Sequence, residues 1–259
     1  PKEPTGTVYH QYCTAIPVGT LLAQSWNPEL MHTLGRMIAG EMNEFEVTLW
    51  LAPGMSLHRN PLCGRNFEYY SEDPLLAGRM AAAMTQGVQS VPGCGTTIKH
   101  YACNNQEDNR MGSDSILSER TLREIYLTGF EIAIRDAQPM AMMTSYNLIN
   151  GVHAANNYDI CTKAARDEWG FAGAIMTDWT TTTDSTAGEC TAAGCMKAGN
   201  DMVMPGDLRD HASIRQALED GSLDIRELKR CVYHTVKIIL QSNQYEDAVS
   251  YEEQFNQMK

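Results

Sequence analysis

The stretch AIMTDWT, residues 174–180, is the part of this chain that best predicts its fold. Ala174–Thr177 has the length and apolar character of a buried strand, and Asp178 follows at its carboxyl end with Trp179 beside it. α/β barrels carry their active-site residues at the carboxyl ends of parallel strands. Asp178 also suits a simpler role as the N-cap of a following helix. The segment alone slightly favours the cap, whereas the rest of the chain favours an active site.

Strand and helix patterns alternate along the chain, which predicts a parallel sheet with crossover helices. The predicted strands are Val47–Ala52, Thr96–His100, Ala141–Ser145, Ala174–Thr177 and Asp201–Met204. The predicted helices are Asn27–Phe45, Pro74–Ser90, Glu119–Ala137, Tyr158–Glu168, Thr191–Ala198, His211–Asp220 and Asp224–Gln241. We predict an α/β fold, a TIM-like (β/α)8 barrel that is incomplete or irregular, because only about five of the usual eight strands are recognisable. Thr14–Leu22 and the residues after Pro205 are candidates for irregular strands.

Length and charge exclude several classes of protein. With 259 residues and no internal repeat, residues 1–259 are expected to form a single domain. A net charge of −12 disfavours nucleic acid as a partner, and no apolar run is long enough to cross a membrane. The first residues show no signal-peptide pattern, which predicts a cytoplasmic protein. The chain begins with Pro1 rather than methionine, so we expect native sequence upstream of it.

The cysteines show no C-x-x-C pair and no spacing typical of zinc ligands. They are Cys13, Cys63, Cys94, Cys103, Cys161, Cys190, Cys195 and Cys231. We expect free thiols in a reducing compartment. A disulfide between Cys190 and Cys195 is the alternative.

Polar side chains collect after the predicted strands, whereas the loops that lead into the strands are short and plain. Arg65 lies in the long loop after the first strand, Lys99 and His100 end the second, and Tyr146 follows the third. Because the carboxyl ends of parallel strands meet at one edge of a sheet, we expect these residues to gather around Asp178.

The residue types at this edge suit a ligand with apolar faces and hydroxyl edges, as a sugar has. Trp179 supplies a flat apolar wall, and the neighbouring donors suit several hydroxyls. The chain has no glycine-rich phosphate loop after a strand, no H-E-x-x-H metal motif and no G-x-S-x-G elbow. The sequence therefore predicts no metal site and no organic cofactor.

Each polar candidate also has a purely structural interpretation. Arg65 suits an ion pair with Glu68 or Glu72 in its own loop. The Lys99-His100 pair suits a partly exposed strand end without a ligand, and Tyr146 suits a core position with its hydroxyl satisfied. The placement of all of them after successive strands favours the functional interpretation.

Long and specific runs occur in order along the chain: SWNPEL, LAPGMSLHRNPLCGRNFEYYSEDP, IKHYACNNQEDNR, SERTLREIYLTGFEIAI, MMTSYNLINGVHAANN, RDEWGFAGAIMTDW and AGNDMVMPG. In these runs the chain resembles the β-glucosidases of glycoside hydrolase family 3, from about Tyr12 to Gln241. KHYACNN differs from the K-H-F-P-G run of the N-acetylglucosaminidase branch. The chain therefore resembles the glucosidase and xylosidase branch.

The resemblance implies roles for single residues. Asp178 in MTDW falls on the family's catalytic nucleophile, and Trp179 falls on the aromatic residue that lines the sugar subsite. Arg65 in GRNFE and Lys99-His100 in KHY fall on residues that hydrogen-bond sugar hydroxyls. Tyr146 in TSYN falls on the tyrosine that bonds the nucleophile. The implied reaction is retaining hydrolysis of terminal β-D-glucosides or oligosaccharides through a covalent glycosyl-enzyme on Asp178, without a cofactor. Trp179 favours a β-glucosidase over a β-xylosidase.

The family's general acid/base is a glutamate on a separate α/β sandwich domain, and we expect that domain to be a partner of residues 1–259. The family's Asp-Gly-Pro-type segment is also missing, because the chain starts with PKEPTG just downstream of it. An inactive sugar-binding barrel that lacks its acid/base is the alternative, and a non-catalytic scaffold is a third. If residues 1–259 hydrolyse glycosides alone, the candidate acids are Glu68, Glu72, Glu107 and Asp108.

Overall fold

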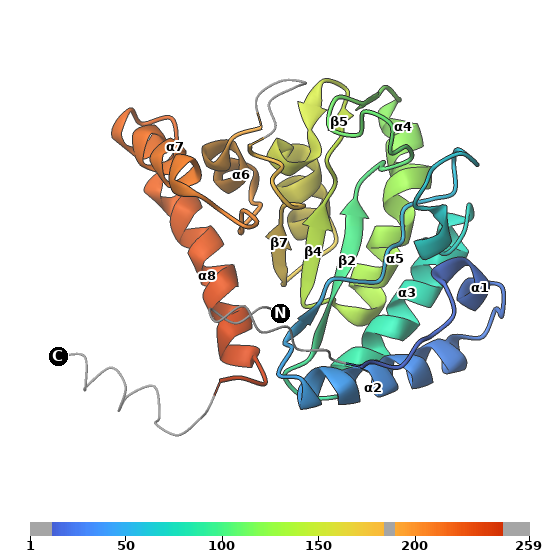
Figure 1. Ribbon diagram of the computed structural model, residues 1–259. Coiled ribbons are helices and arrows are strands. Elements are labelled where there is room, and N and C mark those ends of the chain that lie inside the picture. The colour runs from blue at the N-terminus through green and yellow to red at the C-terminus, as the bar shows by residue number, and fades with distance from the viewer. Residues whose placement is uncertain (1–11, 184–189, 246–259) are drawn as a thin grey trace.

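The computed structural model describes residues 12–183 and 190–245. At its centre lies a four-stranded parallel sheet in the order β1-β2-β4-β7 (Figure 1). These strands are β1 (Leu49–Trp50), β2 (Gly95–Tyr101), β4 (Ala141–Thr144) and β7 (Ala174–Met176). A smaller sheet contains β3 (Asp114–Ser115), β5 (Leu148–Ile149) and β6 (Val152–His153). Parallel pairing brings the carboxyl ends of β2, β4 and β7 to one edge.

The helices flank this sheet on two sides. The α-helices are α1 (Gly19–Ala23), α2 (Pro28–Glu44), α3 (Pro74–Gln89), α4 (Glu119–Thr121), α5 (Thr128–Ala137), α6 (Ala192–Ala198), α7 (Leu208–Glu219) and α8 (Ile225–Gln241). Short 3-10 turns are η1 (Asn66–Glu68) and η3 (Ala154–Asn156), and π-helical segments are η2 (Leu122–Leu127) and η4 (Asp159–Glu168). In Figure 1, α2, α3 and α5 lie on one side of the sheet and α6, α7 and α8 lie on the other.

Alternate residues of the strands bury apolar side chains on both faces of the sheet. Ile98, Met142 and Ile175 belong to the core that α3 and α5 cover. Met143 of β4 points into a second cluster, which includes Ile238 of α8. Burying one such side chain stabilises a fold by roughly 1.5–3 kcal/mol. Burial on both faces explains why the strands are short, apolar runs without a polar face.

The predicted α/β fold is confirmed, and the described strands form an open sheet rather than a closed barrel. The predicted strand Asp201–Met204 is wrong, because only Met202 forms a bridge, with Met176 of β7. Side chains replace the missing ladder bonds: the Asp201 carboxylate accepts from the Ile175 amide, and Thr177 Oγ1 accepts from the Met204 amide. Thr14–Leu22 supplies no strand either, since α1 begins at Gly19.

A buried ionic cluster holds the beginning of β7. Asp201 Oδ2 lies 2.5 Å from Arg166 Nη2 and accepts from the Ile175 amide at 2.7 Å. Asp201 Oδ1 lies 2.9 Å from His234 Nδ1 of α8. The cluster therefore ties η4, β7 and α8 together below the strand end that carries Asp178.

Capping residues start the helices largely where the sequence predicts. Asn27 accepts from the Leu30 amide at the start of α2, and Asp73 does the same for Leu75 in α3. The helix predicted from His211 begins at Leu208 instead, because Asp207 forms a capping box with Asp210. The helix predicted over residues 119–137 contains the π-helical η2 between α4 and α5, and residues 159–168 are also π-helical.

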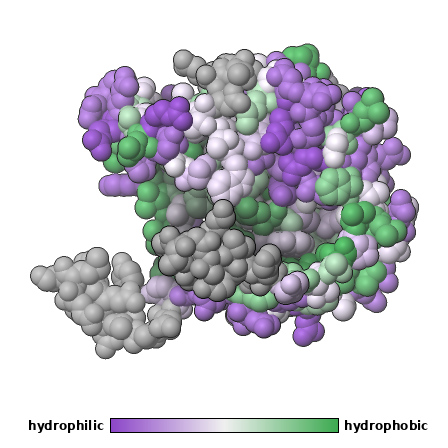
Figure 2. All heavy atoms as spheres, in the orientation of Figure 1, coloured by the Kyte–Doolittle hydropathy of each residue, from purple (hydrophilic) through white to green (hydrophobic). Residues whose placement is uncertain are grey.

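The cysteines are free thiols, so the prediction is confirmed and the alternative Cys190–Cys195 disulfide is absent. Among the described residues, no helix combines the length and apolar character needed to cross a membrane. Apolar surface lies along α8 in Figure 2, where Val232 and Val236 are exposed.

Candidate active site

Asp178 and His100 meet at the carboxyl edge of the sheet. Asp178 follows the end of β7, and His100 lies near the end of β2. His100 Nε2 lies 3.5 Å from Asp178 Oδ2, and the two residues are only 2% and 5% exposed. Strands that are distant in sequence thus place an imidazole against a buried carboxylate.

A β-bulge in β2 aims His100 at this position. Lys99 pairs with Met143 and Tyr101 pairs with Thr144, so His100 is the extra residue without an opposite partner on β4. A bulge re-aims a side chain next to a site in this way. The His100 backbone is fixed by Ser56, whose Oγ accepts from the His100 amide at 3.3 Å and lies 3.2 Å from its carbonyl oxygen.

The Asp178 carboxylate has one occupied and one free oxygen. Oδ1 accepts from the Trp179 amide at 2.7 Å. Oδ2 is buried and accepts no hydrogen bond from any residue that the structure describes. The helix-capping interpretation is wrong for α6, the next described helix, because its N-cap is Thr191. The free lone pairs of Oδ2 suit attack on an electrophile.

Tyr146 and Trp179 lie beside the carboxylate. The Tyr146 hydroxyl donates to the Trp179 carbonyl oxygen at 2.8 Å, the carbonyl of the residue after Asp178. Burial raises the pKa of Tyr146, and the Asp178 charge raises it further. The Arg110 guanidinium stacks on the Tyr146 ring, with 4.3 Å from Cζ to the ring centroid. Trp179 is 49% exposed, which leaves its indole accessible to a ligand.

Arg65, Lys99 and His100 are electrostatically coupled. Burial holds the pKa of His100 well below its ordinary value of 6.5, and the positive charges of Arg65 and Lys99 lower it further. Burial also lowers the pKa of Lys99, while the negative charges of Glu68 and Asp178 oppose that shift. Arg65 pairs with Glu68, as its structural interpretation predicts. The charges of both residues also act on Lys99. The described residues therefore hold a neutral imidazole close to two cations and a carboxylate.

Sequence reasoning missed most of a second row of polar residues behind His100, of which it named only Glu107, as a candidate acid. The Tyr69 hydroxyl lies 2.9 Å from His100 Nδ1, and Asn104 Nδ2 donates to the Tyr69 oxygen at 2.8 Å. The same Asn104 nitrogen lies 3.0 Å from Glu107 Oε1, and Arg110 donates to Glu107 Oε2 at 2.8 Å. These residues lie in the two loops that are rich in polar residues. The polar composition of these loops predicted that they contribute to the site, but only the fold shows which of their side chains turn inward.

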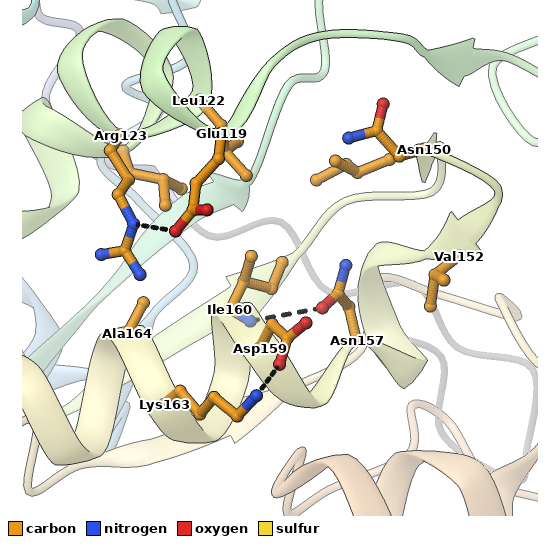
Figure 3. A pocket seen from close by; sticks show the side chains of 12 residues that line it. Glu119, Leu122, Arg123, Asn150, Val152, Asn157, Asp159, Ile160, Lys163 and Ala164 are labelled. Carbon is orange, nitrogen blue, oxygen red and sulfur yellow. Dashed lines mark hydrogen bonds and ion pairs between the residues drawn. The ribbon is translucent and has the colours of Figure 1, made fainter.

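The cavity in Figure 3, of about 450 Å³, lies elsewhere and contains none of the predicted site residues. It is lined by residues of α4, η2, η4 and the β5–β6 hairpin. Two of the lining residues, Asp159 and Lys163 of η4, form an ion pair with each other. Within residues 12–183 and 190–245, no group of three or more His, Cys, Asp or Glu side chains is arranged to hold a metal ion.

Comparisons with known proteins agree on one family. The model of the "Glycosyl hydrolase family 3 N terminal domain" matches residues 3–238. The chain is 43% identical over 226 residues to an exo-alpha-(1->6)-L-arabinopyranosidase of Bifidobacterium breve, covering 87% of this chain and 29% of the relative. It is 49% identical over 166 residues to beta-glucosidase A of Butyrivibrio fibrisolvens, covering 64% of this chain and 20% of the relative.

A solved structure gives the same result. Beta-glucosidase 3B of Thermotoga neapolitana in complex with glucose superimposes with a TM-score of 0.83 at 45% identity, covering 88% of this chain and 32% of that chain. The chain thus spans less than a third of these relatives. From its family match, its sequence identity and its structural similarity, the chain belongs to glycosyl hydrolase family 3 and corresponds to the N-terminal barrel domain of that family.

Proposed function

We propose that the protein is a retaining β-glucosidase and that this chain supplies its nucleophile, Asp178. The observation that carries the proposal is the geometry of the carboxylate. Asp178 Oδ2 accepts no hydrogen bond from the described residues and lies 3.5 Å from His100 Nε2. The exposed Trp179 indole beside it suits the apolar face of a pyranose ring.

The proposed reaction has two steps. In the first, an Asp178 carboxylate oxygen forms a bond to the anomeric carbon, while the bond from that carbon to the leaving oxygen breaks and the leaving oxygen takes a proton from a second carboxyl group. In the second, water attacks the anomeric carbon, gives its proton to the second carboxylate and frees Asp178. Lys99, Arg65 and His100 are proposed to hydrogen-bond the sugar hydroxyls and keep the ring in place.

The second carboxyl group is proposed to come from an α/β sandwich domain of the same protein or a partner. Two of the carboxylates considered within this chain already have ion-pair partners, since Glu68 pairs with Arg65 and Glu107 pairs with Arg110. Retaining enzymes hold their two carboxyl groups roughly 5 Å apart. A chain that spans less than a third of its relatives leaves ample sequence for such a domain in the whole protein.

A pentopyranosidase is the second candidate, because one similar relative is an exo-alpha-(1->6)-L-arabinopyranosidase. An arabinopyranoside lacks the hydroxymethyl group that a glucoside carries at C5, and a xyloside lacks it as well. Aryl β-D-glucoside, β-D-xyloside and α-L-arabinopyranoside should therefore be compared by kcat/KM on the complete protein. We expect the glucoside to be preferred, and a higher kcat/KM for a pentoside would identify the second candidate.

The decisive experiment is trapping with a 2-deoxy-2-fluoro-β-D-glucoside, followed by mass mapping of the labelled peptide. The label is expected on the peptide that contains Asp178 and is expected to be lost in Asp178→Asn. Asp159→Asn, which changes a surface carboxylate in the same way, is the matched control and should still be labelled. Labelling of another carboxylate would refute the assignment, and no label on an active protein would argue against a retaining mechanism.

A further inference from the structure

We infer that Tyr69 is a positioning residue that fixes the tautomer of His100, so that a hydrogen on Nε2 points at Asp178. The inference rests on the proposed function and adds to it a residue that never touches the sugar. Tyr69 is 0% exposed, and its hydroxyl lies 2.9 Å from His100 Nδ1. The inference depends on the direction of each hydrogen bond in a row of four side chains, of which His100, Tyr69 and Asn104 are buried and Glu107 is partly exposed.

The direction is set at the outer end of the row. The Glu107 carboxylate accepts hydrogen bonds and is already paired with Arg110. Asn104 must therefore turn its amide nitrogen, rather than its oxygen, toward Glu107 Oε1 at 3.0 Å. That same nitrogen lies 2.8 Å from the Tyr69 oxygen, which therefore accepts from Asn104.

The Tyr69 hydroxyl hydrogen remains to be donated, and His100 Nδ1 lies 2.9 Å away. The Ser56 hydroxyl is also near Tyr69, but it is engaged by the His100 backbone, since Ser56 Oγ donates to the His100 carbonyl oxygen and accepts from the His100 amide. A neutral imidazole carries one hydrogen, so an accepting Nδ1 places that hydrogen on Nε2. Burial keeps His100 neutral by holding its pKa well below 6.5. The Nε2 hydrogen then faces Asp178 Oδ2 across 3.5 Å. The other tautomer would turn a lone pair toward the carboxylate and repel it.

Packing holds the Tyr69 ring in the position from which its hydroxyl reaches His100 Nδ1. A Cβ atom at Gly54 would lie 3.0 Å from the Tyr69 ring, so glycine at this position leaves the room that the ring occupies. The rings of Tyr69 and His100 meet edge to face at an interplanar angle of 72°. Asn104 and His100 are also buried, so water does not compete for these bonds.

The test uses Tyr69→Phe in the complete protein, with Tyr70→Phe as the matched control. Tyr70 is the next residue, is also buried and forms no hydrogen bond with His100. We expect Tyr69→Phe to lower kcat/KM for an aryl β-glucoside roughly 3- to 10-fold, the equivalent of one neutral hydrogen bond. The control should stay within about twofold of the parent. In a His100→Asn background, Tyr69→Phe should have no further effect, because Tyr69 acts through His100.

Nitrogen-15 NMR of histidine-labelled protein gives a readout that needs no turnover. The His100 signals, assigned by their loss in His100→Asn, should show hydrogen on Nε2 in the parent and a mixture of tautomers in Tyr69→Phe. Hydrogen on Nδ1 in the parent would overturn the inference even if Tyr69→Phe fails to fold. Equal losses of kcat/KM in the Tyr69 and Tyr70 variants would also overturn it. A correct tautomer in a protein that hydrolyses no glucoside would refute the proposed function and leave the positioning role intact.

Discussion

Replacing Asp201 by asparagine should destabilise the protein far more than the same change at the surface. The Asp201 carboxylate is fully buried and lies 2.5 Å from Arg166 Nη2, which has no other carboxylate partner among the described residues. Asp201→Asn keeps the shape of the side chain and removes its charge. The Arg166 guanidinium would then stay buried with backbone carbonyls such as that of Gly173 as its remaining acceptors.

Removing one partner of a buried ion pair costs roughly 3–5 kcal/mol. The lower end, about 3 kcal/mol, applies here, because the asparagine oxygen can still accept from the Ile175 amide and Arg166 keeps neutral acceptors. For a domain of this size, that loss lowers the melting temperature by roughly 6–12 °C. The measurement is thermal unfolding of the complete protein, followed by circular dichroism at about 222 nm.

Asp159→Asn is the control for the Asp201 variant. Asp159 lies 2.6 Å from Lys163, and both side chains are more than half exposed. Such a surface pair contributes at most about 1 kcal/mol. If the two variants lower the melting temperature equally, the buried cluster does not hold the beginning of β7, and the reasoning is refuted.

Three further predictions concern the site and the isolated chain. Asp178→Asn in the complete protein should lower kcat by several orders of magnitude with an unchanged circular dichroism spectrum, and retention of most activity would mean that another residue is the nucleophile. The pKa of His100 in the folded protein lies well below 6.5, so the unfolded chain binds more protons than the folded protein just below that pH. The free energy of unfolding should therefore fall as the pH drops from about 7 to about 5. Urea titrations should show a smaller fall in His100→Asn. Residues 1–259 alone should hydrolyse aryl glucosides with acidic leaving groups better than alkyl glucosides, because the former need little protonation; equal, normal rates would reveal an acid within the chain.

Local rules predicted much of the fold. Asn27 with Pro28 and Asp73 with Pro74 mark helix starts that the structure confirms, since a cap and a proline act within one turn of chain. The strand Asp201–Met204 could not be predicted correctly, because its apolar pattern resembles a buried strand while the Asp201 side chain replaces the ladder bond. That replacement depends on Arg166 and His234, which are distant in sequence.

The candidate site was predictable at its strand ends and not behind them. Asp178 and His100 meet because parallel strands end at one edge, which follows from the alternation of strands and helices. Tyr69 and Asn104 lie in loops, where no periodicity tells which side chain turns inward. Tyr146 lies beside Asp178, and its hydroxyl donates to the Trp179 carbonyl oxygen, a contact that the sequence does not indicate; its bond to the nucleophile stays a prediction.

The bulge in β2 makes the length of this strand as important as its composition. Tyr101, the residue after the bulge, packs edge to face against Phe130 and Trp169 and donates to the Ile160 carbonyl oxygen at 3.0 Å. A substitution at His100 empties one contact and leaves Tyr101 in the core. Deleting residue 100 would instead remove the bulge, so that Tyr101 would follow Lys99 in a regular ladder opposite Thr144 and no imidazole would face Asp178. The length of β2 therefore matters for the site more than for the core, and a library that varies its side chains should keep the residue count constant so that residue 100 stays at the bulge.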